Sequence, residues 1–246
     1  MRSKLLLGIL TLLLSFSKGF SQKSFTRADT LRGSITPERA WWDLNHYHLA
    51  VEIFPETKSI KGSNTIRYKV VSEYQVLQLD LQEPLKITSI VQAGEELSFK
   101  REGAAHFVTL NKKQVPGTVE ELVVSYEGQP KEAIRPPWDG GITWTKDSNG
   151  KPFIASSNQG IGSSIWWPLK DHPADEVDSL MISVTVPEGL MDISNGRLVE
   201  IEIGKGKNTF HWSVVNPIND YGVNINIGDY VHFGEKYAGE KGTLDM

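Results

Sequence analysis

Apolar and polar residues alternate along most of the chain after residue 40, which is the pattern of half-buried β-strands. In residues 47–53, every odd-numbered position is a large apolar or aromatic residue. The pattern predicts further strands at residues 60–71, 75–81, 85–91, 97–101, 105–110, 119–126, 179–186, 191–195, 198–203, 209–215 and 224–233. No segment shows the period of an amphipathic helix. We therefore expect an all-β fold with two or more packed sheets.

The pattern lapses between Glu127 and Ser164, where glycine and proline are frequent. A loop of this length inside a compact domain is usually functional. It leads into Gly160 and Gly162, which permit unusual backbone angles, and then into Trp166 and Trp167. This stretch, residues 155–187, is the best candidate for a site. The alternative is a crossover between sheets whose tryptophans only fill the core.

The N-terminus has the features of a secretory signal peptide at residues 1–21. Arg2 and Lys4 precede an apolar run, and small residues precede the predicted cleavage before Gln22. A single N-terminal anchor is the alternative. We expect a polar, flexible lead-in at residues 22–40, a β domain at 41–238, and the start of a further segment at 239–246. The mature protein would be exported to the periplasm or outside the cell, with no membrane association after cleavage.

Composition narrows the possible partners and cofactors. The formal net charge of −4 gives no basic surface for nucleic acid. Cysteine is absent, so disulfides and cysteine-built metal sites are excluded. None of the six histidines is followed by glutamate, so the His-Glu-x-x-His zinc motif does not occur in this sequence.

Three groups of polar residues are candidates for binding. His46 and His48 would share one face of a strand and could hold zinc with a third ligand, or they could simply form an exposed strand face. An acidic cluster could bind calcium or form a solvated turn; it comprises Asp171, Asp175, Glu176 and Asp178. Gln159 could hold a polar ligand by hydrogen bonds or could bond to its own backbone.

Several stretches together resemble the N-terminal domain of the aminopeptidase N family, the gluzincin zinc aminopeptidases. The resemblance covers roughly residues 41–233. It rests on residues 47–49 with 60–62 and 65–66, residues 77–81 with 85–87, residues 122–128, Gln159 with Trp167, Pro168, Asp171 and Pro173, residues 194–198, residues 217–221 and residues 227–229.

The resemblance implies a saddle-like, multi-sheet β-sandwich that rests against a thermolysin-like catalytic domain. It implies that Gln159, beside Gly160, binds the free amino group of a peptide substrate. Two positions depart from the family pattern: Ser157 stands where a second Gln is frequent, and Leu169 stands where Cys is usual. The family's zinc ligands, glutamate base and Gly-x-Met-Glu-Asn strand have no match here. We therefore assign no catalytic or metal-binding residue and expect no cofactor in this chain, with zinc in a downstream domain.

Two functions follow from these observations. The chain is the substrate-anchoring domain of an exported zinc aminopeptidase, inactive by itself, or a free-standing secreted module that binds glycans or a protein. A third reading is a β scaffold that only packs against a neighbouring domain. The tryptophans discriminate between them. Exposed, coplanar rings at Trp138, Trp144, Trp166 and Trp167 would favour glycans, and rings buried between sheets would favour the peptidase domain.

Overall fold

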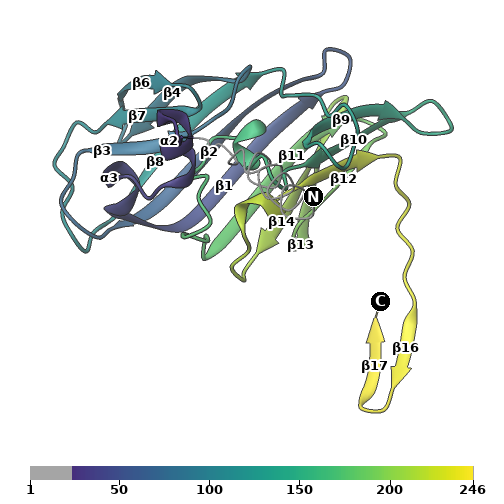
Figure 1. Ribbon diagram of the computed structural model, residues 1–246. Coiled ribbons are helices and arrows are strands. Elements are labelled where there is room, and N and C mark those ends of the chain that lie inside the picture. The colour runs from purple at the N-terminus through teal and green to yellow at the C-terminus, as the bar shows by residue number, and fades with distance from the viewer. Residues whose placement is uncertain (1–23, 246) are drawn as a thin grey trace, which may run out of the picture.

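The computed structural model describes residues 24–245 and places most of them in β-strands, which confirms the all-β expectation (Figure 1). The predicted signal peptide at residues 1–21 lies outside the described residues. Each strand predicted from the alternating pattern overlaps an observed strand. In the described part of the chain, no helix is both long and apolar enough to cross a membrane.

The largest sheet has eight strands in the order β13-β14-β11-β1-β2-β8-β4-β5. Its strands are β1 (Trp42–Phe54), β2 (Ser59–Val70), β4 (Lys86–Gln92), β5 (Glu95–Glu96), β8 (Val119–Gly128), β11 (Ser179–Pro187), β13 (Arg197–Ile203) and β14 (Lys207–Val214). The β1 and β11 strands pair in parallel, and the other pairs in this sheet are antiparallel. The chain therefore leaves the sheet after β8 and re-enters it beside β1.

Two smaller sheets complete the body of the domain. The four-stranded sheet, in the order β12-β15-β10-β9, consists of β9 (Gly141–Lys146), β10 (Pro152–Ser157), β12 (Met191–Ser194) and β15 (Ile225–Gly228). The three-stranded sheet, in the order β3-β7-β6, consists of β3 (Val76–Asp80), β6 (Ser98–Glu102) and β7 (Ala105–Thr109). Leu49 of β1, Leu79 of β3 and Ile154 of β10 belong to one buried cluster. All three sheets thus share a hydrophobic core.

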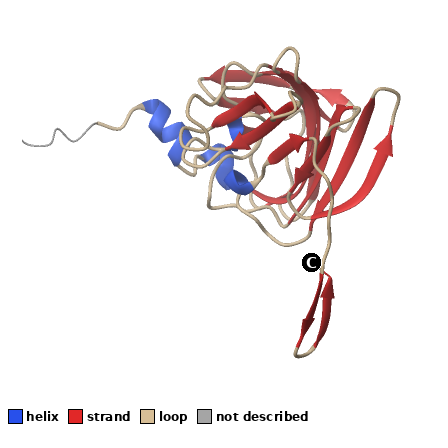
Figure 2. Ribbon diagram, turned by 90° about the vertical axis from the view of Figure 1, so that its right-hand side faces the viewer, coloured by secondary structure: helices blue, strands red, loops and turns tan. Residues whose placement is uncertain are grey.

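Residues 24–40, which were expected to be part of a polar, flexible lead-in, contain two short helices. This segment forms α2 (Arg27–Gly33) and α3 (Pro37–Ala40), which Figure 2 shows as short helices beside the sheets. Thr26 caps α2 in a reciprocal capping box with Asp29. Pro37 occupies the first turn of α3. Both helices are too short to show an apolar period, so only their capping residues indicate them in the sequence.

The expectation of irregular structure throughout residues 127–164 is also wrong. β9 and β10 form a hairpin within it, with Ile154 opposite Trp144. Oδ1 of Asp147 accepts hydrogen bonds from the backbone N–H groups of Asn149 and Lys151, at 2.8 and 2.9 Å. Asp147 to Gly150 is therefore an Asx-type turn, a sequence signal for a hairpin that the glycine-rich surroundings conceal.

The last described residues form a hairpin of β16 (Lys236–Gly239) and β17 (Gly242–Asp245). It extends away from the three sheets (Figure 1). The predicted end of the β domain at residue 238 falls inside β16.

Candidate functional site

Gln159 lies on an exposed turn that follows β10 at one end of the four-stranded sheet. The preceding residue, Asn158, is only 3% exposed. Its carbonyl oxygen accepts from the N–H groups of Ile161 and Gly162 at 3.2 and 2.9 Å, and its Nδ2 donates to the carbonyl oxygen of Val223 at 2.6 Å. Asn158 therefore fixes the base of the turn while Gln159 points outward. No hydrogen bond joins the Gln159 side chain to another described residue.

The backbone of this turn is held by side chains from other parts of the fold. Nη2 of Arg32, on α2, donates to the carbonyl oxygen of Gly160 at 2.8 Å. Nε2 of Gln82 donates to the carbonyl oxygen of Ile161 at 2.7 Å. These contacts join residues that are 128 and 79 positions apart in the chain. The turn that carries Gln159 is consequently braced from the lead-in helix and from the segment after β3.

Gly162 is required where the turn meets the next segment. Its φ is +83°, and a Cβ atom there would overlap the carboxylate of Asp171. That carboxylate is fixed, because its Oδ2 accepts from the backbone N–H of Ser164 at 3.2 Å and from Oγ of Ser164 at 2.5 Å. Gly160 also has a positive φ, +82°, but a Cβ there would meet nothing within 4 Å. Gly160 is therefore needed only for its backbone angle, whereas Gly162 is needed both for its backbone angle and for the close approach of the Asp171 carboxylate.

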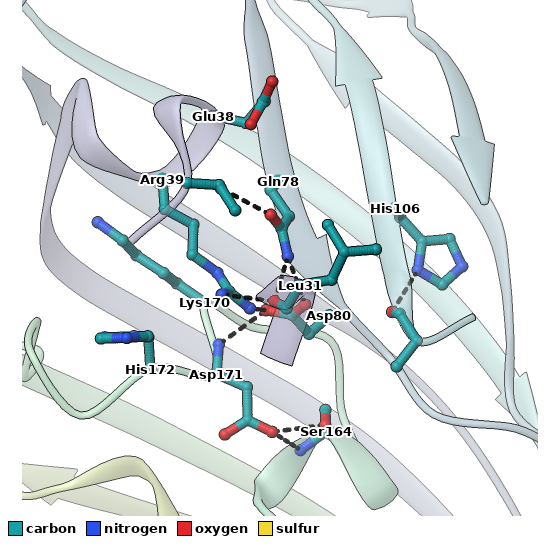
Figure 3. Close-up of polar contacts among 12 residues, drawn as sticks. Leu31, Glu38, Arg39, Gln78, Asp80, His106, Ser164, Lys170, Asp171 and His172 are labelled. Atoms are coloured by element: carbon teal, nitrogen blue, oxygen red, sulfur yellow. Dashed lines mark hydrogen bonds and ion pairs between the residues drawn. The ribbon is translucent and has the colours of Figure 1, made fainter. Parts of the chain in front are cut away.

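A buried ion pair beneath the site joins the lead-in to β3 (Figure 3). Nη2 of Arg39 lies 2.5 Å from Oδ2 of Asp80, and the two side chains are 1% and 6% exposed. Gln78 donates to Oδ1 of Asp80 at 3.0 Å, and the backbone N–H of Asp171 donates to Oδ2 at 3.1 Å. Burial raises the pKa of Asp80 to about 6, and the charge of Arg39 opposes that rise. The carboxylate is therefore mostly ionised at neutral pH and holds α3 and the site loop together.

The exit of the loop is fixed by Lys170, which is 5% exposed. Its Nζ donates to the carbonyl oxygen of Trp42 at 2.8 Å, pairs with Asp175, and lies 4.2 Å from the centre of the Trp42 ring. Burial lowers the pKa of Lys170, and Asp175 counteracts this effect. Asp175 is thus an ion-pair partner within the fold.

A hollow of about 520 Å³ adjoins the turn on the side of Gly160 and Gly162. Arg32 of α2 lines it, together with His172 and Asp220. Asp220 is 7% exposed, and burial followed by the nearby charge of Asp171 raises the pKa of its carboxyl well above the usual range. The hollow and the exposed Gln159 amide together form the candidate binding region.

The two histidines that were candidate zinc ligands lie away from the Gln159 turn, and three carboxylates of the acidic cluster have hydrogen-bond or ion-pair partners within the protein. His46 and His48 are on β1, on the face of the eight-stranded sheet opposite to the buried Tyr47 and Leu49. In the acidic cluster, Asp171 accepts from Ser164, Asp175 pairs with Lys170, and Asp178 accepts from Asn45 at 3.2 Å. Within residues 24–245, no group of three or more His, Cys, Asp or Glu side chains could hold a metal ion.

The tryptophans are mostly buried. Trp166 and Trp167 are each 0% exposed, and Trp167 packs edge-on against Tyr47 with the ring centres 5.0 Å apart. Trp144 is partly buried, and Trp138 is 86% exposed. The four rings therefore form no common exposed platform, which is the arrangement expected of the peptidase domain and not of a glycan-binding face.

Sequence reasoning placed Gln159 and Gly160 on the loop but missed the residues that hold it, namely Arg32, Arg39, Asp80 and Gln82. These contacts connect distant segments, and no local pattern reveals them. Thr26 with Asp29, and Thr36 with Pro37, are the signals that could have predicted the two helices that supply the arginines.

Comparison with known proteins agrees with this architecture. Residues 44–221 match the family model of the peptidase M1 N-terminal domain. A search of curated proteins found no match. Among solved structures, a mutant two-domain M1 zinc metallopeptidase bound to L-arginine superposes with a TM-score of 0.70 and 20% sequence identity, covering 84% of this chain and 47% of that one.

Two further structures come from Deinococcus radiodurans. Its M1 zinc metallopeptidase superposes with a TM-score of 0.67, 20% identity and coverage of 84% of this chain and 47% of that chain. A mutant of it bound to a Tyr-Ser-Ala substrate gives a TM-score of 0.68, 20% identity and coverage of 87% and 49%. The chain thus spans about half the length of these structures. Its fold and its family match agree: the chain belongs to the peptidase M1 N-terminal domain family.

Proposed function

We propose that this chain is the substrate-anchoring domain of an exported zinc aminopeptidase. In this proposal, Oε1 of Gln159 accepts a hydrogen bond from the free α-amino group of a peptide, and Gly160 leaves room for the peptide beside it. A hydrogen bond to a charged ammonium group is stronger than one between neutral groups. A neutral amide acceptor also avoids the larger desolvation cost of a buried carboxylate.

The observation that carries the proposal is an exposed amide on a braced turn. Arg32, Gln82 and Asn158 hold the backbone on both sides of Gln159, and the Gln159 side chain itself stays outside the core. A binding group held in this way loses little conformational freedom when a ligand arrives. A glutamine serving only the fold would be expected to bond to its own surroundings instead.

The zinc ion would belong to a thermolysin-like catalytic domain that packs against this one. The described residues of this chain do not fit a catalytic zinc, because no group of three suitable side chains occurs among them. A catalytic zinc generates a reactive hydroxide from bound water. This domain would contribute binding and orientation of the peptide, and we expect it to have no peptidase activity alone.

Export is part of the same proposal and rests on the signal-like residues 1–21 of the sequence. Substrates would then be peptides of the periplasm or of the surroundings. The partners of the domain would be the peptide N-terminus and the catalytic domain.

Kinetics of the enzyme that contains this domain test the proposal. In the Gln159→Ala variant, kcat/KM for an aminoacyl anilide should fall about 10- to 100-fold, which is the worth of one hydrogen bond to a charged group. Gln159→Glu should retain most of the activity, because a carboxylate also accepts from an ammonium group. Asn149→Ala alters an amide on another exposed turn and should leave the kinetics unchanged.

Two results would overturn the proposal. One is an unchanged kcat/KM in a folded Gln159→Ala variant. The other is zinc-dependent turnover of an aminoacyl amide by residues 22–246 alone, since that would place the reaction centre in this chain.

A further inference from the structure

Trp138 lies almost entirely outside the hydrophobic core. It is 86% exposed, and Ile134, four positions earlier on the same loop, is 84% exposed. The other tryptophans are buried or partly buried, namely Trp41, Trp42, Trp144, Trp166, Trp167 and Trp212. Tryptophan offers a large apolar surface with few rotatable bonds, so proteins often use it to contact ligands. An exposed tryptophan beside a binding site is therefore a candidate contact.

The loop tip that carries these two residues has a defined backbone. The N–H group of Trp138 donates to the carbonyl oxygen of Arg135 at 2.9 Å, which closes a turn. Oδ2 of Asp139 accepts from the N–H group of Ile134 at 2.6 Å and fixes the entry to that turn. A binding residue on a fixed backbone loses little conformational freedom when a ligand arrives.

Two contacts join this loop to the turn that carries Gln159. Oγ of Ser157 donates to the carbonyl oxygen of Pro137 at 2.8 Å. Gly140 packs against Ile161 so closely that a Cβ atom on the glycine would lie 2.3 Å from Cδ1 of the isoleucine. The first contact precedes the exposed tryptophan by one residue, and the second follows it by two. Both contacts are also two residues from Gln159, so the two loop tips lie side by side.

This neighbourhood determines which part of a peptide would meet the indole. The α-amino nitrogen and the first side chain of a peptide are attached to the same carbon atom. A peptide whose amino group is held by Gln159 therefore places its first side chain close to that turn. An apolar side chain that leaves water for the indole surface gains binding free energy in proportion to the apolar area that is covered.

We propose that Trp138 is a specificity-determining residue of the same site, whose indole contacts the side chain of the first residue of the peptide. This contact favours peptides that begin with a large apolar or aromatic residue over those that begin with alanine or glycine. The inference rests on the proposed function, because it requires that Gln159 holds the amino group.

Kinetics of the enzyme that contains this domain test the inference with leucyl, phenylalanyl and alanyl anilides. In Trp138→Ala, kcat/KM for the leucyl and phenylalanyl substrates should fall about tenfold, and that for the alanyl substrate should fall less than about twofold. Trp138→Phe should keep most of the preference, because a phenyl ring also presents an apolar face. Ile203→Ala removes a 77% exposed apolar side chain on β13 and should leave the ratios unchanged.

Gln159→Ala separates this inference from the proposed function, because it should lower kcat/KM for all three anilides by a similar factor. An unchanged ratio of leucyl to alanyl kcat/KM in a folded Trp138→Ala enzyme would overturn the inference and leave the role of Gln159 intact. A changed ratio in that variant, together with no effect of Gln159→Ala, would overturn the proposed function and keep Trp138 as a contact of the first side chain.

Acrylamide quenching of fluorescence locates the ring directly. The signal of Trp138 is the difference between the unaltered enzyme and the Trp138→Phe variant. We expect this signal to be quenched in the free enzyme and protected by saturating L-leucine, but not by glycine. A ring that is already protected without a ligand would overturn the inference, because the catalytic domain would then cover it.

Discussion

Arg32 donates a hydrogen bond from Nη2 to the carbonyl oxygen of Gly160 at 2.8 Å, and Gly160 is the residue next to Gln159. Arg32 belongs to the lead-in helix α2, and its own side chain is exposed. The contact therefore couples a segment outside the sheets to the turn that presents the candidate binding amide. Its effect should be local, because an exposed side chain contributes little to global stability.

Arg32→Ala should loosen the turn without unfolding the domain. We expect amide hydrogen exchange at Gln159, Gly160 and Ile161 to become about tenfold faster, while the free energy of unfolding changes by less than about 1 kcal/mol. Hydrogen exchange followed by NMR measures this. The control is Arg27→Ala, because Arg27 is on the same helix as Arg32 and its exposed ion pair, with Glu102 of β6, lies away from the turn. Equal exchange at the turn in both variants would contradict the bracing role.

The two glycines of the loop should respond differently to alanine. Gly160→Ala places a side chain at φ +82° with open space around it, so it should cost about 1–2 kcal/mol of unfolding free energy. Gly162→Ala adds an overlap with the fixed carboxylate of Asp171 and should cost about 3 kcal/mol or more. Urea unfolding of both variants measures the difference. Equal losses of unfolding free energy in the two variants would show that the Asp171 carboxylate moves away from the new Cβ atom at little cost.

The buried pair of Arg39 and Asp80 should be costly to break from either side. Arg39→Met leaves the Asp80 carboxylate buried without its cation, and we expect a loss of about 3–5 kcal/mol. Asp80→Leu should have a similar effect by isolating the guanidinium. The double variant Arg39→Met with Asp80→Leu should lose less than the sum of the two, as a double-mutant cycle in denaturant would show. Additive losses would mean that the two residues do not act as a pair.

Asp192 should make stability fall as the pH rises. Its side chain is fully buried, Oδ2 accepts from Nε1 of Trp212 at 2.9 Å, and burial raises its pKa to about 7. The folded state therefore holds a proton that the unfolded state, with an ordinary pKa of about 4, has released. This contribution is complete below about pH 4 and is lost as the pH rises through 7.

The unaltered chain should consequently lose about 2 kcal/mol more unfolding free energy than the Asp192→Asn variant between pH 5.5 and pH 8. Denaturant unfolding of both chains at the two pH values gives this difference. The pH dependence that comes from all other titratable groups is the same in both chains and cancels. If the two chains have parallel pH profiles, Asp192 is ionised in the fold at both pH values.

The sequence pattern was informative where structure repeats along a strand and uninformative where it depends on contacts between distant segments. Alternation located β1 because Tyr47 and Leu49 face the core while His48 faces outward. It could not locate α3, whose four residues are too few for a period. The pair of Arg39 and Asp80, 41 residues apart, leaves no local sign. Gln159 was found through the family resemblance and not through periodicity.

The acidic cluster illustrates the same limit. Asp171, Asp175 and Asp178 are close in sequence, which suggested either a calcium site or a solvated turn. In the fold, Asp171 accepts from Ser164, Asp175 pairs with Lys170 and Asp178 accepts from Asn45. Partners that come from other elements, such as Asn45 on β1, determine what these carboxylates do.

A crystal structure of the enzyme that contains this domain, with a bound amino acid or short peptide, tests the central claim most directly. The account predicts that Oε1 of Gln159 lies about 2.7–3.2 Å from the α-amino nitrogen of the ligand. A ligand whose amino group is bound entirely by other residues, with the Gln159 amide turned away into solvent, would contradict it.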